Sequence, residues 1–202
     1  SVKKGVKQFG GTPREFCTIT VTDGIAMGHE GMKSSLISRE IIADSAELTV
    51  RGHCYDALVG IAGCDKSLPG LMMSMLRLNV PSVFIYGGSI LPGKYKGKDV
   101  TVVDVFEAVG KHSSGSMSSE ELRELELVAC PSAGACGGQF TANTMACVSE
   151  AIGLALPYSA GTPAPYEERD KYAFESGQTV MNLLEKKIKP REIVTKKSLE
   201  NA

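Results

Sequence analysis

Three consecutive residues with chemically versatile side chains, Cys64, Asp65 and Lys66, follow a short apolar run at 57–62. A thiolate favours iron–sulphur clusters or zinc, whereas carboxylate oxygens favour magnesium. The apolar run fits one buried strand, and open α/β sheets bind ligands where their strands end. The stretch is therefore a candidate site for two kinds of metal. A plainer interpretation, with Cys64 packed, Asp65 capping a helix and Lys66 in solvent, is the commoner one for three such residues alone.

Two further candidate ligands lie elsewhere in the chain. Cys136 is surrounded by small residues in the stretch 132–141, which can wrap an inorganic cluster because no bulky side chain blocks it and its amides can bond to sulphur. Asp23 follows the apolar residues 18–21 and offers a hard oxygen ligand. The residues alone leave two alternatives open, a tight turn with a buried thiol at Cys136 and an Asx-turn at Asp23.

Alternating strand and helix patterns must position these residues. Strands are predicted at 18–21, 57–62 and 82–86, and a loop at 91–98. Helices are predicted at about 34–51, 68–78, 102–109, 118–129, 141–156 and 167–188. This order predicts a single α/β domain over residues 1–202, with a mainly parallel sheet flanked by helices in a three-layer α/β/α arrangement.

Several of these helices carry more detailed predictions. Ser118 and Glu121 fit a capping box, and Gly52 is placed to end the 34–51 helix. The buried face of that helix is expected to hold Leu36, Ile37, Ile41, Ala43, Leu48 and Val50, and its wetter side Arg39, Glu40, Asp44 and Glu47. Four cysteines are interpreted as packing residues that a cluster does not need: Cys17, Cys54, Cys130 and Cys147.

Composition narrows the class of protein. A formal net charge of −1 over 202 residues gives no bulk attraction to nucleic acid or anionic lipid. No run approaches the roughly 20 apolar residues of a membrane span. Six cysteines in a chain of this size indicate a reducing, intracellular setting rather than a disulfide scaffold. The last residues, 197–202, look like the opening of a helix, so we expect a piece of a longer protein.

Long blocks of the sequence resemble the dihydroxy-acid dehydratase family, which also includes phosphogluconate and sugar-acid dehydratases. The matching blocks cover nearly the whole chain and are residues 16–33, 38–45, 63–66, 69–72 and 134–145. Two departures, Cys17 where the family usually has Asn and Gln139 where it often has Met, touch no assigned ligand. The Asn143-Thr144 pair is closer to the branched-chain enzyme than to the phosphogluconate one.

The resemblance implies a set of cofactors and ligands. Cys64 and Cys136 match cysteines that hold an iron–sulphur cluster, of either the 2Fe–2S or the 4Fe–4S type. The third cysteine belongs to an upstream motif that this chain does not contain. Asp23, Asp65 and Lys66, the last as a carbamate, match magnesium ligands.

The resemblance also implies an activity, dehydration of 2,3-dihydroxy carboxylic acids to 2-keto acids in branched-chain amino-acid biosynthesis. The serine base and a glutamate ligand belong to a missing C-terminal domain, so no catalytic base is assigned in this chain and the fragment alone is expected to be inactive. The implied partners are the small-molecule substrate, that domain and a second copy in a homodimer, with no nucleic acid and no membrane. The implied location is cytoplasmic, or organellar in a eukaryote.

Two alternatives stay open at this point. One is a sugar-acid or phosphogluconate-type dehydratase with the same metals and a longer substrate. The other is a metal- or redox-sensing domain that uses the same cysteines without catalysis.

Overall fold

A computed structural model describes residues 1–202, and its centre is a two-stranded parallel sheet. Strand β1 (Leu58–Ala62) pairs with β2 (Ser82–Tyr86) in a register that sets Leu58 against Ser82 and Ala62 against Tyr86. A single parallel bridge, Phe84 with Ala155, adds one more contact on the other side of β2. The α/β class is confirmed at this level.

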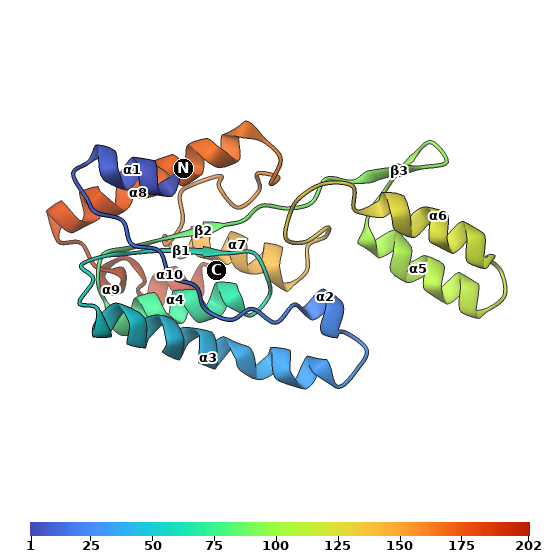
Figure 1. Ribbon diagram of the computed structural model, residues 1–202, viewed down its shortest axis with the longest axis horizontal. Coiled ribbons are helices and arrows are strands. Elements are labelled where there is room, and N and C mark those ends of the chain that lie inside the picture. Colours follow the sequence, from blue (N-terminus) through green and yellow to red (C-terminus); the bar gives the residue numbers. More distant parts are fainter.

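Helices surround this sheet (Figure 1). One side is covered by α4, against which α3 packs, and the other by α8, against which α1 packs. The helices are α1 (Val2–Gln8), α2 (Asp23–Ala26), α3 (Gly31–Gly52), α4 (Ser67–Leu78), α5 (Val102–Ser113), α6 (Ser119–Ala129), α7 (Thr141–Ala151), α8 (Glu167–Lys186), α9 (Pro190–Ile193) and α10 (Lys196–Glu200). None of them is long and apolar enough to cross a membrane.

The predicted strand at 18–21 is wrong. Residues 11–22 run without regular structure, and side chains replace the strand's backbone partners: Ser45 Oγ donates to Thr18 Oγ1 at 2.7 Å, and Thr20 Oγ1 lies 3.1 Å from Ser67 Oγ. The apolar alternation is real, but no neighbouring strand lies beside it, so no ladder forms.

The predicted loop at 91–98 is also wrong, because it forms an antiparallel hairpin. Strand β3 (Gly93–Tyr95) pairs with β4 (Lys98–Val100). With α5 and α6 the hairpin makes an arm that extends away from the rest of the molecule (Figure 1). The arm has a small core of its own, formed by Val100, Ala108, Leu125 and Ala129.

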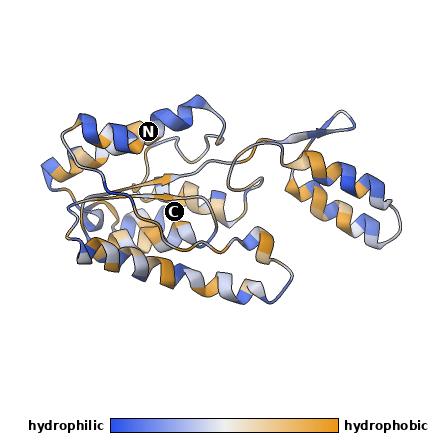
Figure 2. Ribbon diagram, viewed as in Figure 1, coloured by the Kyte–Doolittle hydropathy of each residue, from blue (hydrophilic) through white to orange (hydrophobic).

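Helix α3 turns a different face to the core than its apolar residues predict. Its buried positions include Ser35, Ser38, Ile42 and Ala46, whereas Ile37 is 66% and Leu48 71% exposed. Small residues occupy this face because α4 approaches it closely. A Cβ at Gly70 of α4 would lie 2.8 Å from the Arg39 carbonyl oxygen. Leu36 and Ile41 are exposed as well, while Ala43 and Val50 are buried as expected. Figure 2 shows apolar colour on the outer side of α3.

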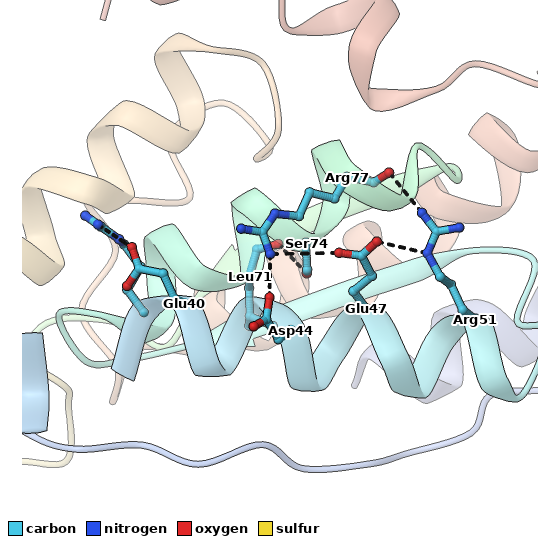
Figure 3. A network of polar contacts seen from close by, with 8 residues as sticks. Glu40, Asp44, Glu47, Arg51, Leu71, Ser74 and Arg77 are labelled. Atoms are coloured by element: carbon cyan, nitrogen blue, oxygen red, sulfur yellow. Dashed lines mark hydrogen bonds and ion pairs between the residues drawn. The ribbon is translucent and has the colours of Figure 1, made fainter. Parts of the chain in front are cut away.

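The expected wetter side of α3 is confirmed only in part, because Arg39 and Asp44 are exposed whereas the Glu47 side chain is only 22% exposed. Arg77 of α4 reaches Asp44 at 2.7 Å and Glu47 at 3.8 Å, and Arg51 joins Glu47 at 2.9 Å (Figure 3). Most of these side chains remain accessible to solvent, so we expect the network to orient α3 on α4 and to contribute little stability.

Several helix boundaries follow their sequence signals. The capping box of Ser118 and Glu121 is confirmed at the start of α6, and Gly52 is the last residue of α3. Helix α7 is shorter than predicted and ends at Ala151, two residues before Gly153, whose φ is +83°. The packing interpretation of four cysteines is wrong, because all four are exposed: Cys17, Cys54, Cys130 and Cys147.

Candidate metal and cluster site

Two cysteine-bearing segments that are far apart in sequence meet beyond the end of β1. We call residues 63–66 the Cys64 loop and residues 132–140 the Cys136 loop. A Cβ at Gly63 would lie 3.1 Å from Ala135 Cβ, so the residues preceding the two cysteines touch. The structure therefore brings together the two loops that the sequence singles out.

The Cys136 loop is held against the chain that follows β2. Ala135 N donates to the Gly88 carbonyl at 2.9 Å, and Ile90 N donates to the Cys136 carbonyl at 3.0 Å. Gly134 adopts a φ of +150°, and a Cβ there would lie 2.6 Å from Ile90 N. Only glycine fits this position, because both the backbone conformation and the close approach exclude a side chain.

A cavity of about 460 Å³ lies where these loops meet the unstructured N-terminal segment. Threonine, glycine and alanine make most of its wall, and Cys64 is its only thiol. The lining residues are Thr20, Thr22, Gly63, Cys64, Gly87, Ala133, Gly134, Ala135 and Ala164. The side chain of Cys136 is half-buried against the main core, immediately after the cavity wall formed by Ala135. A wall of such small side chains leaves room for an inorganic group.

Tyr86, the last residue of β2, lies near both thiols. Burial raises the pKa of its hydroxyl, and the negative charges of Cys136 and Cys64 raise that pKa further. Burial, followed by the charge of Cys136, also raises the pKa of Cys130 at the end of α6. Tyr86 is therefore a neighbour of both cysteine loops, whereas Cys130 is a neighbour of Cys136.

The candidate magnesium ligands form a second, adjoining group. Asp23, the first residue of α2, is 5% exposed, and Lys66 Nζ lies 3.2 Å from its Oδ2. The Ser35 hydroxyl donates a hydrogen bond to Asp23 Oδ1. Asp65 lies beside Asp23 and near Thr141 at the start of α7. Three separate helices thus converge on this carboxylate pair.

The two carboxyl groups have opposite pKa shifts. Burial, followed by the hydrogen bond and charge of Asp23, raises the pKa of Asp65 to about 6. Burial acts to raise the pKa of Asp23 too, but hydrogen bonds involving Asp65, Ser35 and Lys66 outweigh it and lower that pKa. Two carboxylates this close repel each other when both are ionised, so one pKa is raised and a cation beside the pair is favoured.

The ligand set within this chain is small. No three His, Cys, Asp or Glu residues converge on one point. The chain brings the two cysteine-bearing loops into contact and, next to them, places the buried carboxylate of Asp23, the half-buried carboxylate of Asp65 and a lysine. Sequence reasoning missed Ser35 and Tyr86, because these residues carry no local motif and matter only through contacts across the fold with Asp23 and Asn143.

The fold and the site define an α/β chain with thiols and carboxylates on neighbouring loops. Comparison with known proteins then identifies the group to which it belongs. The model of the dihydroxy-acid/6-phosphogluconate dehydratase N-terminal region matches residues 1–202. The chain belongs to this family, which confirms the resemblance seen in the sequence.

Curated relatives carry a consistent name. The chain is 90% identical over 202 residues to the dihydroxy-acid dehydratase of Pelagibacter ubique (strain HTCC1062), covering all of this chain and 35% of that protein. It is 80% identical over 202 residues to that of Parvibaculum lavamentivorans, with the same coverage of both. Identity to the dihydroxy-acid dehydratase of Sulfurisphaera tokodaii is 56% over 201 residues, covering 100% of this chain and 36% of the relative. The chain thus spans about a third of the length of these relatives.

Proposed function

We propose that the chain is the cluster- and magnesium-binding part of a dihydroxy-acid dehydratase. The complete enzyme is a hydro-lyase that converts 2,3-dihydroxy acids of the 2,3-dihydroxy-3-methylbutanoate type to 2-keto acids in branched-chain amino-acid biosynthesis. The observation that carries this proposal is the contact of the Cys64 and Cys136 loops beside the Asp23–Asp65 pair. The relatives' names favour this substrate over phosphogluconate or a longer sugar acid.

The cysteine loops fit an iron–sulphur cluster of the 2Fe–2S or 4Fe–4S type. Thiolates are the ligands that such clusters use, and backbone amides in a small-residue loop can bond to their sulphurs. The glycines support the fit, because a Cβ at Gly134 or Gly88 would approach neighbouring backbone within 2.6 Å. Cys64 and Cys136 would each supply one thiolate, and the remaining ligand would come from outside this chain.

The carboxylate pair fits magnesium. A hard dication prefers oxygen ligands, and it would relieve the repulsion that raises the pKa of Asp65. The ammonium of Lys66 is the counterion of Asp23 in this chain. When its neutral amine adds to carbon dioxide and loses a proton, the carbamate becomes an anionic oxygen ligand. Asp23, Asp65 and the Lys66 carbamate would then hold the ion together.

The residues of this chain hold and orient the groups that would contact the substrate. When bound, the cluster and magnesium supply Lewis acidity toward hydroxyl and carboxylate oxygens of the substrate. Ser35 donates a hydrogen bond to Asp23 Oδ1 and so fixes the orientation of that carboxylate. The serine base lies in the C-terminal part of the enzyme, so this chain alone is inactive.

The same proposal extends to architecture and setting. Residues 1–202 form one α/β domain, and further strands in the complete enzyme extend the β1–β2 pair into a three-layer α/β/α arrangement. The remaining two thirds of the enzyme supply the C-terminal domain, and two copies form a homodimer. Six free cysteines support a reducing, cytoplasmic location, or an organelle in a eukaryote.

The test is a substrate panel on the complete enzyme, isolated without oxygen, together with iron, sulphide and magnesium analysis. We expect 2-keto acid from 2,3-dihydroxy-3-methylbutanoate, and much slower turnover of 6-phosphogluconate and longer sugar acids. Preferred turnover of 6-phosphogluconate would mean that 6-phosphogluconate, and not 2,3-dihydroxy-3-methylbutanoate, is the substrate. A preparation with iron and sulphide that turns over no member of the panel would indicate a sensing domain and overturn the proposal.

A further inference from the structure

The hydroxyl of Tyr86 makes one specific contact inside the main core. Tyr86 is 1% exposed, and its hydroxyl donates to Asn143 Oδ1 at 2.5 Å. Burial, followed by the charge of Cys136, raises the pKa of this hydroxyl. In this contact the hydroxyl is the donor, because the Asn143 oxygen can only accept.

Asn143 passes this contact on to the Cys136 loop. It is the third residue of α7, and its Nδ2 donates to the carbonyl of Gly138, two residues after Cys136. The Gly138 carbonyl fixes which way the amide points, because a carbonyl can only accept and so requires Nδ2; Oδ1 is then left to accept from the Tyr86 hydroxyl, which holds the amide in place. The two hydrogen bonds consequently form one chain from β2 to the loop.

This chain completes the attachment of the Cys136 loop to one strand. Before and at the cysteine, the loop is bonded to Gly88 and Ile90, which follow β2 directly. After the cysteine, it is bonded through Asn143 to Tyr86, the last residue of the same strand. Hydrogen bonds therefore attach both ends of the segment that carries the thiol to β2 or to the residues that follow it.

Arg169 of α8 holds Tyr86 from the opposite direction. Its guanidinium lies 5.9 Å from the centre of the Tyr86 ring, and its Nη1 donates to the Tyr86 carbonyl at 2.8 Å. Its Nη2 donates to the carbonyl of Thr162, in the segment that brings Ala164 to the cavity wall. The ring thus has little freedom to follow a displaced loop.

We propose that Tyr86 and Asn143 are positioning residues that set the Cys136 thiol for the cluster. This inference rests on the proposed function and adds two residues that touch neither metal nor substrate. In this role the Tyr86 hydroxyl holds the Asn143 amide in place through Oδ1, and the amide holds the loop carbonyl at Gly138 through Nδ2. Losing either group leaves the thiolate in place but widens the range of positions it samples, so the cluster dissociates faster.

The test measures cluster release from the complete enzyme by the decay of cluster absorbance under anaerobic chelation. Tyr86→Phe keeps the ring and is expected to speed release about fivefold, the effect of one hydrogen bond. Asn143→Asp sets a carboxylate against the Gly138 carbonyl and is expected to speed release by at least about tenfold. Tyr95→Phe is the matched control, because its hydroxyl bonds to Glu121 and Glu124 in the distant arm, and release is expected at the wild-type rate.

A double variant separates positioning from a general role in the core. Because both residues act through one chain, Tyr86→Phe combined with Asn143→Leu should release the cluster no faster than Asn143→Leu alone. A structural role would lower the melting temperature of the metal-free variants and leave the release rate and the cluster spectrum at wild-type values, which would overturn the inference. A wild-type enzyme without iron and sulphide would instead overturn the proposed function itself.

Discussion

Gly134→Ala is expected to open the Cys136 loop locally. The φ of +150° at Gly134 is one that L side chains rarely adopt, which costs about 1–3 kcal/mol. The new Cβ would also lie 2.6 Å from Ile90 N and 2.7 Å from Ser89 C, and overpacking of this kind costs about 1–3 kcal/mol. One displacement of the loop relieves part of both, so we expect a total of about 2–4 kcal/mol.

Amide hydrogen exchange in the complete enzyme reads this effect where it occurs. The Ala135 amide donates to Gly88 and the Ile90 amide to Cys136, so both report opening of the loop. A change of about 2–4 kcal/mol in opening free energy lowers protection of these amides about 30- to 900-fold. Peptides covering 130–140 and 86–92 carry the signal, and the iron content should fall with it.

The control for this substitution is Gly110→Ala in α5. No heavy atom lies within 4 Å of a Cβ there and the position is helical, so alanine should stabilise the arm by about 0.5–1 kcal/mol. Protection in the Cys136 loop should stay at the wild-type level in this variant. Wild-type protection and full iron in Gly134→Ala would refute the claim that the loop is fixed by its close approach to Ile90.

Three further predictions concern individual side chains of the complete enzyme. Cys64→Ser should lose most of the iron, whereas Cys54→Ser, at an exposed thiol, should keep it; equal iron in both would show that the ligand was wrongly chosen. Lys66→Arg should keep a cation beside Asp23 yet abolish turnover, because a guanidinium cannot become an oxygen ligand; near-normal activity would mean a simple cation suffices. Ser35→Ala removes a hydrogen bond that orients the Asp23 carboxylate, so the magnesium affinity measured by calorimetry should fall at least about tenfold. An unchanged affinity would contradict the assigned role of Ser35.

Local sequence signals were sufficient for much of the central fold. The apolar runs at 57–62 and 82–86 became β1 and β2 almost residue for residue, although Ile61 of β1 is exposed, and the helix between them begins and ends within a residue of its prediction. The capping box at Ser118 worked because its two hydrogen bonds need only residues three apart. Such features depend on neighbours in sequence, which the sequence displays.

Features that depend on distant partners could not be predicted in this way. The alternation at 18–21 has strand character, but a strand needs a neighbour, and α3 and α4 offer only side-chain hydroxyls. On α3 the bulky residues indicated the wrong face, because the close approach of α4 at Gly70 selects serine and alanine. Periodicity identifies a helix but does not say which side meets its partner when both sides carry apolar residues.

The candidate site also contains residues that the sequence predicts and residues that only the tertiary structure reveals. Its cysteines, aspartates and lysine stand out as residue types within motifs, and the structure brings their loops together. Tyr86, Asn143 and Ser35 are common residues in ordinary positions, and only the fold shows their hydrogen bonds to one another, to the Cys136 loop and to Asp23. Residue type therefore predicted which side chains could be ligands, while the residues that orient them required the tertiary structure.

The central claim is that Cys64 and Cys136 ligate one iron–sulphur cluster. Anomalous scattering at the iron edge, from crystals of the complete enzyme grown without oxygen, tests it most directly. We expect a single compact iron peak at bonding distance from the sulphur of Cys64 and from that of Cys136. Iron bound at only one of these thiols, or at Cys17, Cys54 or Cys147 instead, would contradict it.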